Sequence, residues 1–134
     1  MDVDDFKALN DTYGHNSGDT VLKNIAANML DVSNEWLKIC RSGGEEFVCM
    51  VTGANASEYL TSQLEQLRHA IARMPMNLQN QEMYVTVTIG TAQYHPKDES
   101  YHEILKRADE ALYEGKKQGK NVWCADEQEN IDYR

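Results

Sequence analysis

The sequence predicts an α+β fold with a ferredoxin-like core, in which an antiparallel central sheet is flanked by helices. The predicted order of elements is strand, helix, strand, strand, helix, strand, helix, strand. Two patterns predict this order: apolar residues recur at helical spacing in the longer segments, and β-branched or aromatic residues gather in short runs between turn residues. The length of 134 residues allows one domain with a workable core.

The first half of the chain supplies the opening strand, a helix and a hairpin. Its predicted elements are a strand at residues 1–5, a helix at residues 18–30 and strands at residues 36–40 and 47–51. Leu22, Ile25 and Met29 form the apolar stripe of the helix. Gly43 and Gly44 stand between the last two strands. Because glycine tolerates the positive φ of tight turns, this pair predicts a two-residue hairpin turn.

The second half supplies two longer helices, each followed by a strand, and a polar end. Its predicted elements are a helix capped by Asn55 with Glu58 and stopped by Pro75, a strand at residues 83–94, a helix that begins at a Ser100–Glu103 capping box, a strand at residues 121–124 and an acidic tail at residues 126–134. Lys116, Lys117 and Gly119 end the last helix, as cations and glycine commonly do. We therefore expect one domain at residues 1–125, followed by the tail.

The charge of the chain excludes some classes of partner. The formal net charge is −9, whereas nonspecific binding to nucleic acid or to a membrane surface needs a basic patch. We therefore expect no nucleic-acid partner and no direct membrane contact. An anionic nucleotide would have to be bridged to this protein by metal.

The cysteines favour a reducing compartment. The chain contains Cys40, Cys49 and Cys124, an odd number without CxxC spacing. In the predicted hairpin Ser42 faces Glu45. Cys40 then lies opposite Phe47 and not opposite Cys49, so a cross-strand disulfide is not favoured.

Targeting signals are also missing from the sequence. No run approaches the roughly 18 apolar residues of a membrane span, and the acidic start differs from the basic start of a signal peptide. We expect the chain to work in the cytoplasm, by itself or as the cytoplasmic part of a larger sensor protein.

Two acidic motifs carry the strongest functional signal. Glu45 and Glu46 follow the glycine pair at the exit of the predicted turn, and Asp2 and Asp4 open the chain. Asp2 and Asp4 are two residues apart, so in a strand both point to one face, where a carboxylate could meet Glu45 across the sheet. Such carboxylates suit Mg2+, which prefers oxygen ligands and brings substrate phosphates with it. The pattern indicates nucleotide chemistry.

Four sequence blocks follow one another along the chain: residues 2–19, 43–47, 85–90 and 108–113. The first follows the pattern D-x-D-x-F-K-x-x-N-D-x-x-G-H-x-x-G-D, and the second is Gly43-Gly44-Glu45-Glu46-Phe47. In these blocks the chain resembles the GGDEF family of diguanylate cyclases in its common GGEEF form. The resemblance covers residues 1–125 and implies the palm fold of nucleotidyl cyclases, which is also ferredoxin-like.

The resemblance implies an enzyme that joins two GTP into cyclic di-GMP and releases two pyrophosphates. It implies a catalytic homodimer, because each 3′-hydroxyl attacks the α-phosphate of the GTP on the other domain. It also implies Mg2+ or Mn2+, two per active site, held by Asp2, the carbonyl of Val3, Glu45 and Glu46, while Asp4 is structural. Glu45 is further implied as the general base. For Glu46 a second interpretation stays open, as the cross-strand partner of Arg41.

The resemblance also implies the residues that contact GTP. Asn10 and Asp19 match the guanine positions, Lys7, Lys116 and Lys120 match cations near the phosphates, and Phe6, His15, Gly43 and Gly44 match further positions beside the nucleotide. Lys7 would stabilise charge that develops in phosphoryl transfer. Lys120 stands where the family usually has arginine, so bidentate contact to phosphate is lost. The alternatives are ordinary surface lysines and a buried, structural His15.

Two departures from the family pattern carry expectations of their own. Family members have several dozen more residues before the D-x-D motif, so we expect a fragment or a truncated product. The Arg-x-x-Asp of the family's product-inhibition site is replaced at Asn34 and Leu37, so strong product inhibition is not expected. The alternative function is a non-catalytic GTP-binding or interaction module. A palm cyclase with another nucleotide product is disfavoured by Asn10 and Asp19.

Overall fold

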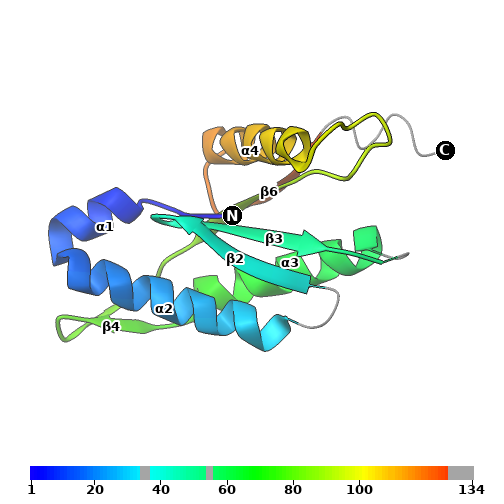
Figure 1. The fold of residues 1–134 in the computed structure, drawn as a ribbon. Coiled ribbons are helices and arrows are strands. Elements are labelled where there is room, and N and C mark those ends of the chain that lie inside the picture. Colours follow the sequence, from blue (N-terminus) through cyan, green and yellow to red (C-terminus); the bar gives the residue numbers. More distant parts are fainter. Residues whose placement is uncertain (34–36, 54–55, 127–134) are drawn as a thin grey trace.

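The computed structural model describes residues 1–33, 37–53 and 56–126 (Figure 1). Its elements are β1 (Asp2–Val3), α1 (Phe6–Tyr13), α2 (His15–Val32), β2 (Leu37–Gly43), β3 (Glu46–Val51), α3 (Ala56–Arg73), β4 (Met76–Leu78), β5 (Gln81–Met83), β6 (Val87–Thr91), α4 (Tyr101–Lys117) and β7 (Trp123–Ala125). No helix in these ranges is long and apolar enough to cross a membrane.

The central sheet has the strand order β2-β3-β1-β6-β7. Antiparallel ladders join β2, β3, β1 and β6, and β7 joins β6 in parallel. With β1 between β3 and β6, the strands β2, β3, β1 and β6 have the arrangement of a ferredoxin-like core. The predicted fold class is therefore confirmed.

The helices divide between the two faces of the sheet. Figure 1 shows α2 and α3 on one face and α4 on the other. The core between the sheet and helices α2 and α3 contains Val3, Val21, Leu22, Ile25, Met29, Phe47, Leu64, Leu67, Ile71, Val87 and Ile89. On the other face α4 packs on β6 and β7. Lys38, Cys40 and Met50 of the β2–β3 hairpin are exposed, so this half of the sheet is open beside the GGEEF turn.

Two glycines let α4 lie close to the sheet. A Cβ on Gly90 of β6 would stand 2.3 Å from the carbonyl oxygen of Ala108 and 2.3 Å from the backbone nitrogen of Leu112. A Cβ on Gly115 of α4 would stand 2.8 Å from Cγ2 of Thr88. The absence of side chains at these two positions therefore sets the height of α4, and with it the position of the lysines at its end.

The β2–β3 register differs by one residue from the predicted one. Cys40 pairs with Val48 and Arg41 with Phe47, and the ladder shifts between Arg41 and Gly43 before Gly43 pairs with Glu46. A β-bulge at this point adds one unpaired residue to β2, whereas the predicted register assumed a regular hairpin. The two-residue turn is therefore formed by residues 44–45, and Glu45 lies in it. The cysteines are free, as expected.

Two further elements were not predicted, and one strand is shorter than expected. α1 lies within residues 2–19, and β4 pairs with β5 in a separate hairpin. The turn of the β4–β5 hairpin consists of Gln79 and Asn80. Their φ angles of 51° and 65° are positive, as a two-residue hairpin turn requires. The predicted strand at residues 83–94 is therefore wrong in extent, because Met83 belongs to β5 and β6 spans Val87–Thr91.

The predicted helix ends are confirmed in part. Lys116 and Lys117 lie in the last turn of α4, and Gly119 beyond it has a φ of +119°. Ser100 makes no side-chain cap, however, and the Glu103 carboxylate accepts the N–H of Glu99 at 2.6 Å. The predicted cap at Asn55 and the tail from residue 127 onward lie outside the described residues.

Candidate active site

The GGEEF turn meets the central strand at Asp2 and Val3. The N–H of Val3 donates to the carbonyl of Glu45 at 3.3 Å, and Asp2 lies opposite Glu46 in the β1–β3 ladder. The N–H and C=O of a strand residue point to the same side, so the carbonyl of Val3 also faces the turn. The backbones of Asp2 and Val3 thus lie beside those of Glu45 and Glu46 at one edge of the sheet.

Asp2 carries an unsatisfied oxygen. Within the described part of the chain, its Oδ1 is buried without a hydrogen-bond partner. Burial raises the pKa of Asp2, the Lys116 ammonium opposes this shift, and the negative charge of Glu45 adds to it. A carboxylate oxygen without a partner, beside a second carboxylate and a carbonyl, fits a divalent cation.

The protein's share of that site is small. Among the described residues no group of three or more His, Cys, Asp and Glu side chains converges on one point. Asp2 and Glu45 with the Val3 carbonyl would therefore leave several positions of an octahedral ion to substrate phosphates and water, as Mg2+ usually does in nucleotide sites.

Asp4 has a different environment from Asp2. Its carboxylate accepts hydrogen bonds from Oγ1 of Thr86 at 2.7 Å, Oγ1 of Thr88 at 2.6 Å, Nζ of Lys116 at 2.8 Å and the N–H of Asn121 at 2.9 Å. Burial by itself would raise the pKa of Asp4, but these hydrogen bonds, that of Lys116 foremost, bring it below its ordinary value. With its acceptor sites filled by protein groups, Asp4 is a structural residue that joins β1, β6 and the end of α4.

Two of the three lysines predicted near the phosphates, Lys116 and Lys120, are paired with carboxylates. Lys116 Nζ lies 2.8 Å from Asp4 Oδ1 and 3.5 Å from Asp2 Oδ2, and Lys120 Nζ pairs with Asp5 Oδ1. The end of α4 therefore lies directly beside the turn between β1 and α1. The sequence offered no signal for the Lys120–Asp5 pair, because Asp5 is a variable position of the resemblance.

The predicted guanine-binding residues lie where α1 meets α2. Asn10 packs against Gly18: a Cβ at Gly18 would stand 1.9 Å from Asn10 Oδ1 and 3.1 Å from Cζ of Phe6. Within the described residues this Oδ1 is buried and has no hydrogen-bond partner. Asp19, the next residue of α2, is exposed. Asn10 thus has an unsatisfied acceptor, its Oδ1, packed against Gly18. The exposed carboxylate of Asp19 belongs to the next residue of the chain.

The other predicted site residues lie at the surface. Lys7 and Glu46 are exposed, and an added Cβ at Gly43 or Gly44 would meet nothing within 4 Å. His15 is also exposed, so the alternative of a buried structural histidine is wrong.

The alternative partner of Glu46 is not observed. Nε of Arg41 donates to the carbonyl of Gly44 at 3.0 Å, and Arg41 lies opposite Phe47 in the ladder. Among the described residues, then, no ion pair ties Glu46 to Arg41.

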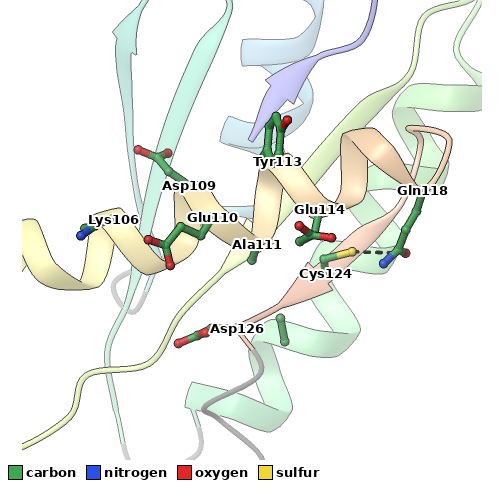
Figure 2. A pocket seen from close by; sticks show the side chains of 10 residues that line it. Lys106, Asp109, Glu110, Ala111, Tyr113, Glu114, Gln118, Cys124 and Asp126 are labelled. Atoms are coloured by element: carbon green, nitrogen blue, oxygen red, sulfur yellow. Dashed lines mark hydrogen bonds between the residues drawn. The ribbon is translucent and has the colours of Figure 1, made fainter.

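A groove of about 990 Å³ lies elsewhere, between α4 and β7 (Figure 2). Its lining includes Asp109, Glu110, Glu114 and Asp126 but one lysine, Lys106, and none of the predicted site residues. Four carboxylates repel the phosphates of a nucleotide, so this groove does not suit GTP.

Comparison with known families identifies the arrangement. Residues 1–122 match the family described as diguanylate cyclase, GGDEF domain. This chain belongs to the GGDEF family. Metal dependence is a general property of GGDEF diguanylate cyclases, in agreement with the unsatisfied oxygen of Asp2.

Relatives and solved structures agree with this assignment. The GGDEF chain is 36% identical over 121 residues to diguanylate cyclase A of Treponema denticola, covering 90% of this chain and 32% of that protein. It is 35% identical over 135 residues to diguanylate cyclase DgcZ of Escherichia coli K12, covering 98% and 44%. The GGDEF domain of DgcB from Caulobacter crescentus, solved with c-di-GMP, superposes with a TM-score of 0.86 at 34% identity, covering 94% of this chain and 72% of that one.

An active GGEEF domain of a diguanylate cyclase from Vibrio cholerae is similar as well. Its TM-score is 0.78 at 34% identity, and the match covers 95% of this chain and 80% of that one. The GGDEF chain thus spans less than half the length of the two curated relatives named above.

Proposed function

We propose that this chain is the catalytic domain of a diguanylate cyclase, which condenses two GTP into cyclic di-GMP and releases two pyrophosphates. The observation that carries the proposal is the meeting of Asp2, the Val3 backbone and Glu45 at one edge of the sheet, with an unpartnered carboxylate oxygen among them. A non-catalytic interaction module would not need to keep a buried carboxylate oxygen unsatisfied, since such an atom costs stability.

The proposed cofactor is Mg2+ or Mn2+, two ions per active site, held by Asp2, Val3, Glu45 and Glu46. When bound, such ions neutralise phosphate charge and lower the pKa of a bound hydroxyl. Lys7 on α1 and the two lysines at the end of α4 would add positive charge around the triphosphate.

Glu45 is the proposed general base. It takes the proton of the 3′-hydroxyl as that oxygen bonds to the α-phosphorus of the second GTP, and the bond from that phosphorus to the bridging oxygen breaks to release pyrophosphate. Because Glu45 lies in the turn, beside exposed Gly43 and Gly44, a nucleotide can approach its carboxylate without meeting side chains.

Guanine recognition is proposed for Asn10 and Asp19, with Phe6 and His15 close to the nucleotide. The unused Oδ1 of Asn10 supports this proposal, since a buried acceptor gains most from a ligand that donates to it. Adenine lacks the donors of the guanine N1 and N2 edge, so ATP would leave these oxygens unpaired.

Two copies of the domain are proposed to act together. One domain offers one GTP site, and each 3′-hydroxyl must reach the α-phosphate of the other nucleotide, so two sites must face each other. We also place the domain in the cytoplasm, where its free cysteines would stay reduced; fractionation of the native protein tests this.

The deciding experiment is an incubation of the chain with GTP and Mg2+, with the products resolved by mass. We expect cyclic di-GMP and pyrophosphate, and no cyclic product from ATP. Glu45→Gln is the matched control: it keeps the side-chain shape but is a poorer metal ligand and no base, so turnover should fall by at least roughly 100-fold. Unchanged circular dichroism would show that the variant folds. Near-parental turnover in Glu45→Gln, or equal use of ATP, would contradict the assignment.

A further inference from the structure

The Lys116 ammonium lies between two carboxylates that have different tasks. It is 2.8 Å from Asp4 Oδ1 and 3.5 Å from Asp2 Oδ2, with the Lys116 side chain 23% exposed. The short contact is therefore to the structural aspartate, and the longer one is to the proposed metal ligand.

Asp4 holds Lys116 without depending on it alone. Thr86, Thr88 and the N–H of Asn121 also donate to the Asp4 carboxylate, which is 3% exposed. A carboxylate fixed by donors from β6 and from the segment after α4 cannot follow a moving lysine. The Lys116–Asp4 contact can therefore stay in place while the rest of the Lys116 side chain changes its conformation.

Asp2 has weaker ties. One of its oxygens is 3.5 Å from Lys116, and the other is buried with no partner in the described part of the chain. The negative charge of Glu45 acts on the same carboxylate. Without a metal ion, the ammonium of Lys116 is the side-chain cation that compensates Asp2.

We propose that Lys116 is a resident counter-ion of the metal site: it neutralises Asp2 in the empty domain, leaves Asp2 when a divalent cation binds there, and turns toward the phosphates while Asp4 holds it. This inference rests on the proposed function of the site. Metal and lysine then compete for Asp2, and the released lysine is available to the nucleotide. Since coupling between two sites is reciprocal, nucleotide that engages Lys116 should also tighten metal binding.

Lys120 provides a matched comparison. It carries the same charge a few residues further along the chain but pairs with exposed Asp5, with side-chain exposures of 40% and 66%. Removing its charge changes the field at Asp2 far less, because solvent screens the Lys120–Asp5 pair.

The test is Mn2+ binding to the full 134-residue chain without nucleotide, measured by the loss of the free Mn2+ signal in electron paramagnetic resonance. At low ionic strength Lys116→Met should bind Mn2+ roughly tenfold more tightly than the parent, because a cation close to the ligand carboxylate is gone. Lys116→Arg keeps the charge and should stay near the parent, and Lys120→Met should differ from it by less than about twofold. No gain in Lys116→Met, including no measurable binding, or an equal gain in Lys120→Met, would overturn the proposal.

A second measurement needs no variant and so remains decisive if Lys116→Met does not fold. The side-chain ammonium resonances of 15N-labelled lysine are followed as Mg2+ is added without nucleotide. The Lys116 signal should shift and exchange faster with water as its contact to Asp2 is lost, while that of Lys120 stays in place. An unmoved Lys116 signal at Mg2+ saturation would overturn the proposal.

Neither readout uses GTP, so the two proposals can fail separately. Lys116-dependent metal binding in a chain that makes no cyclic di-GMP would overturn the proposed activity and keep the counter-ion. Product formation without any Lys116 effect on Mn2+ binding would overturn the counter-ion alone.

Discussion

At the scale of single residues, Asp2 and Asp4 show how environment separates two identical side chains. Asp4 faces two threonine hydroxyls, a lysine and a backbone N–H, whereas Asp2 keeps one buried oxygen without a partner in the described part of the chain. The first arrangement stabilises the fold, and the second leaves an oxygen for the proposed metal ion. A buried carboxylate costs free energy unless its hydrogen bonds are made, so in the empty domain Asp4 contributes more to stability than Asp2 does.

We expect Asp4→Asn to lower the free energy of unfolding by about 2–3 kcal/mol, because the amide cannot accept all the donors and leaves Lys116 partly unpaired. Urea unfolding at pH 7 measures this. Asp5→Asn is the control: it removes the same charge from an exposed pair, and asparagine tolerates the positive φ of 55° at this position. Its cost should be much smaller. Equal costs for the two variants would contradict the structural assignment of Asp4.

Product feedback is a second matter decided by single residues. Leu37, at the first position of β2, is buried and offers no carboxylate to a guanine, and Asn34 lies outside the described residues. Without the charged pair, cyclic di-GMP should inhibit weakly and by competition with GTP. Rates at fixed GTP with added product, repeated at higher GTP, test this. Potent inhibition that extra GTP does not relieve would mean that a separate product site exists.

At the scale of elements, the sequence predicts what depends on periodicity and misses what depends on local exceptions. α2, α3, α4 and the β2–β3 hairpin follow from apolar spacing and from the glycine pair. Two features do not follow from these patterns: the bulge between Arg41 and Gly43, and the turn at Gln79 and Asn80. Each depends on one or two backbone dihedrals that several residue types allow.

The site shows the same division. Matching the motifs brought Asp2, Val3 and Glu45 together, and in the structure the N–H of Val3 donates to the carbonyl of Glu45. The contacts of Lys116 with Asp4 and Asp2 join residues more than a hundred positions apart. They depend on how closely α4 packs on β6, which no local pattern encodes.

That packing gives a prediction about α4. Gly90→Ala should destabilise the domain by about 3 kcal/mol, because its Cβ meets the backbone of α4 and the helix must move away. Gly115→Ala should cost less, about 1–2 kcal/mol, because its Cβ meets Cγ2 of Thr88 at 2.8 Å and no backbone atom, while alanine favours the helix. Thermal and urea unfolding compare the two variants. A cost for Gly115→Ala as large as that for Gly90→Ala would contradict the larger share that we assign to the backbone contact at Gly90.

At the scale of the whole molecule, the proposed function makes this fold one half of a reaction centre. In Figure 1 the GGEEF turn, the C-terminal end of α4 and α1 lie at the same end of the sheet, and α4 covers β6 and β7. The proposed reaction forms two phosphodiester bonds between two nucleotides. Under this proposal one such surface holds one nucleotide, so a single copy would not complete the product.

The specific activity should therefore rise with protein concentration while dimers are scarce and level off once they dominate. Rates per milligram over a dilution series, with sedimentation at the same concentrations, measure this. A mixture of the parent with excess Glu45→Gln gives a sharper test, because a mixed pair has one competent base. One 3′-hydroxyl then attacks and one pyrophosphate leaves, so a linear dinucleotide that still carries a triphosphate should accumulate in place of the cyclic product. Two parental bases are needed to close the ring if the site is shared. A flat dependence on concentration in dilute monomer, together with cyclic product alone in the mixture, would contradict a shared active site.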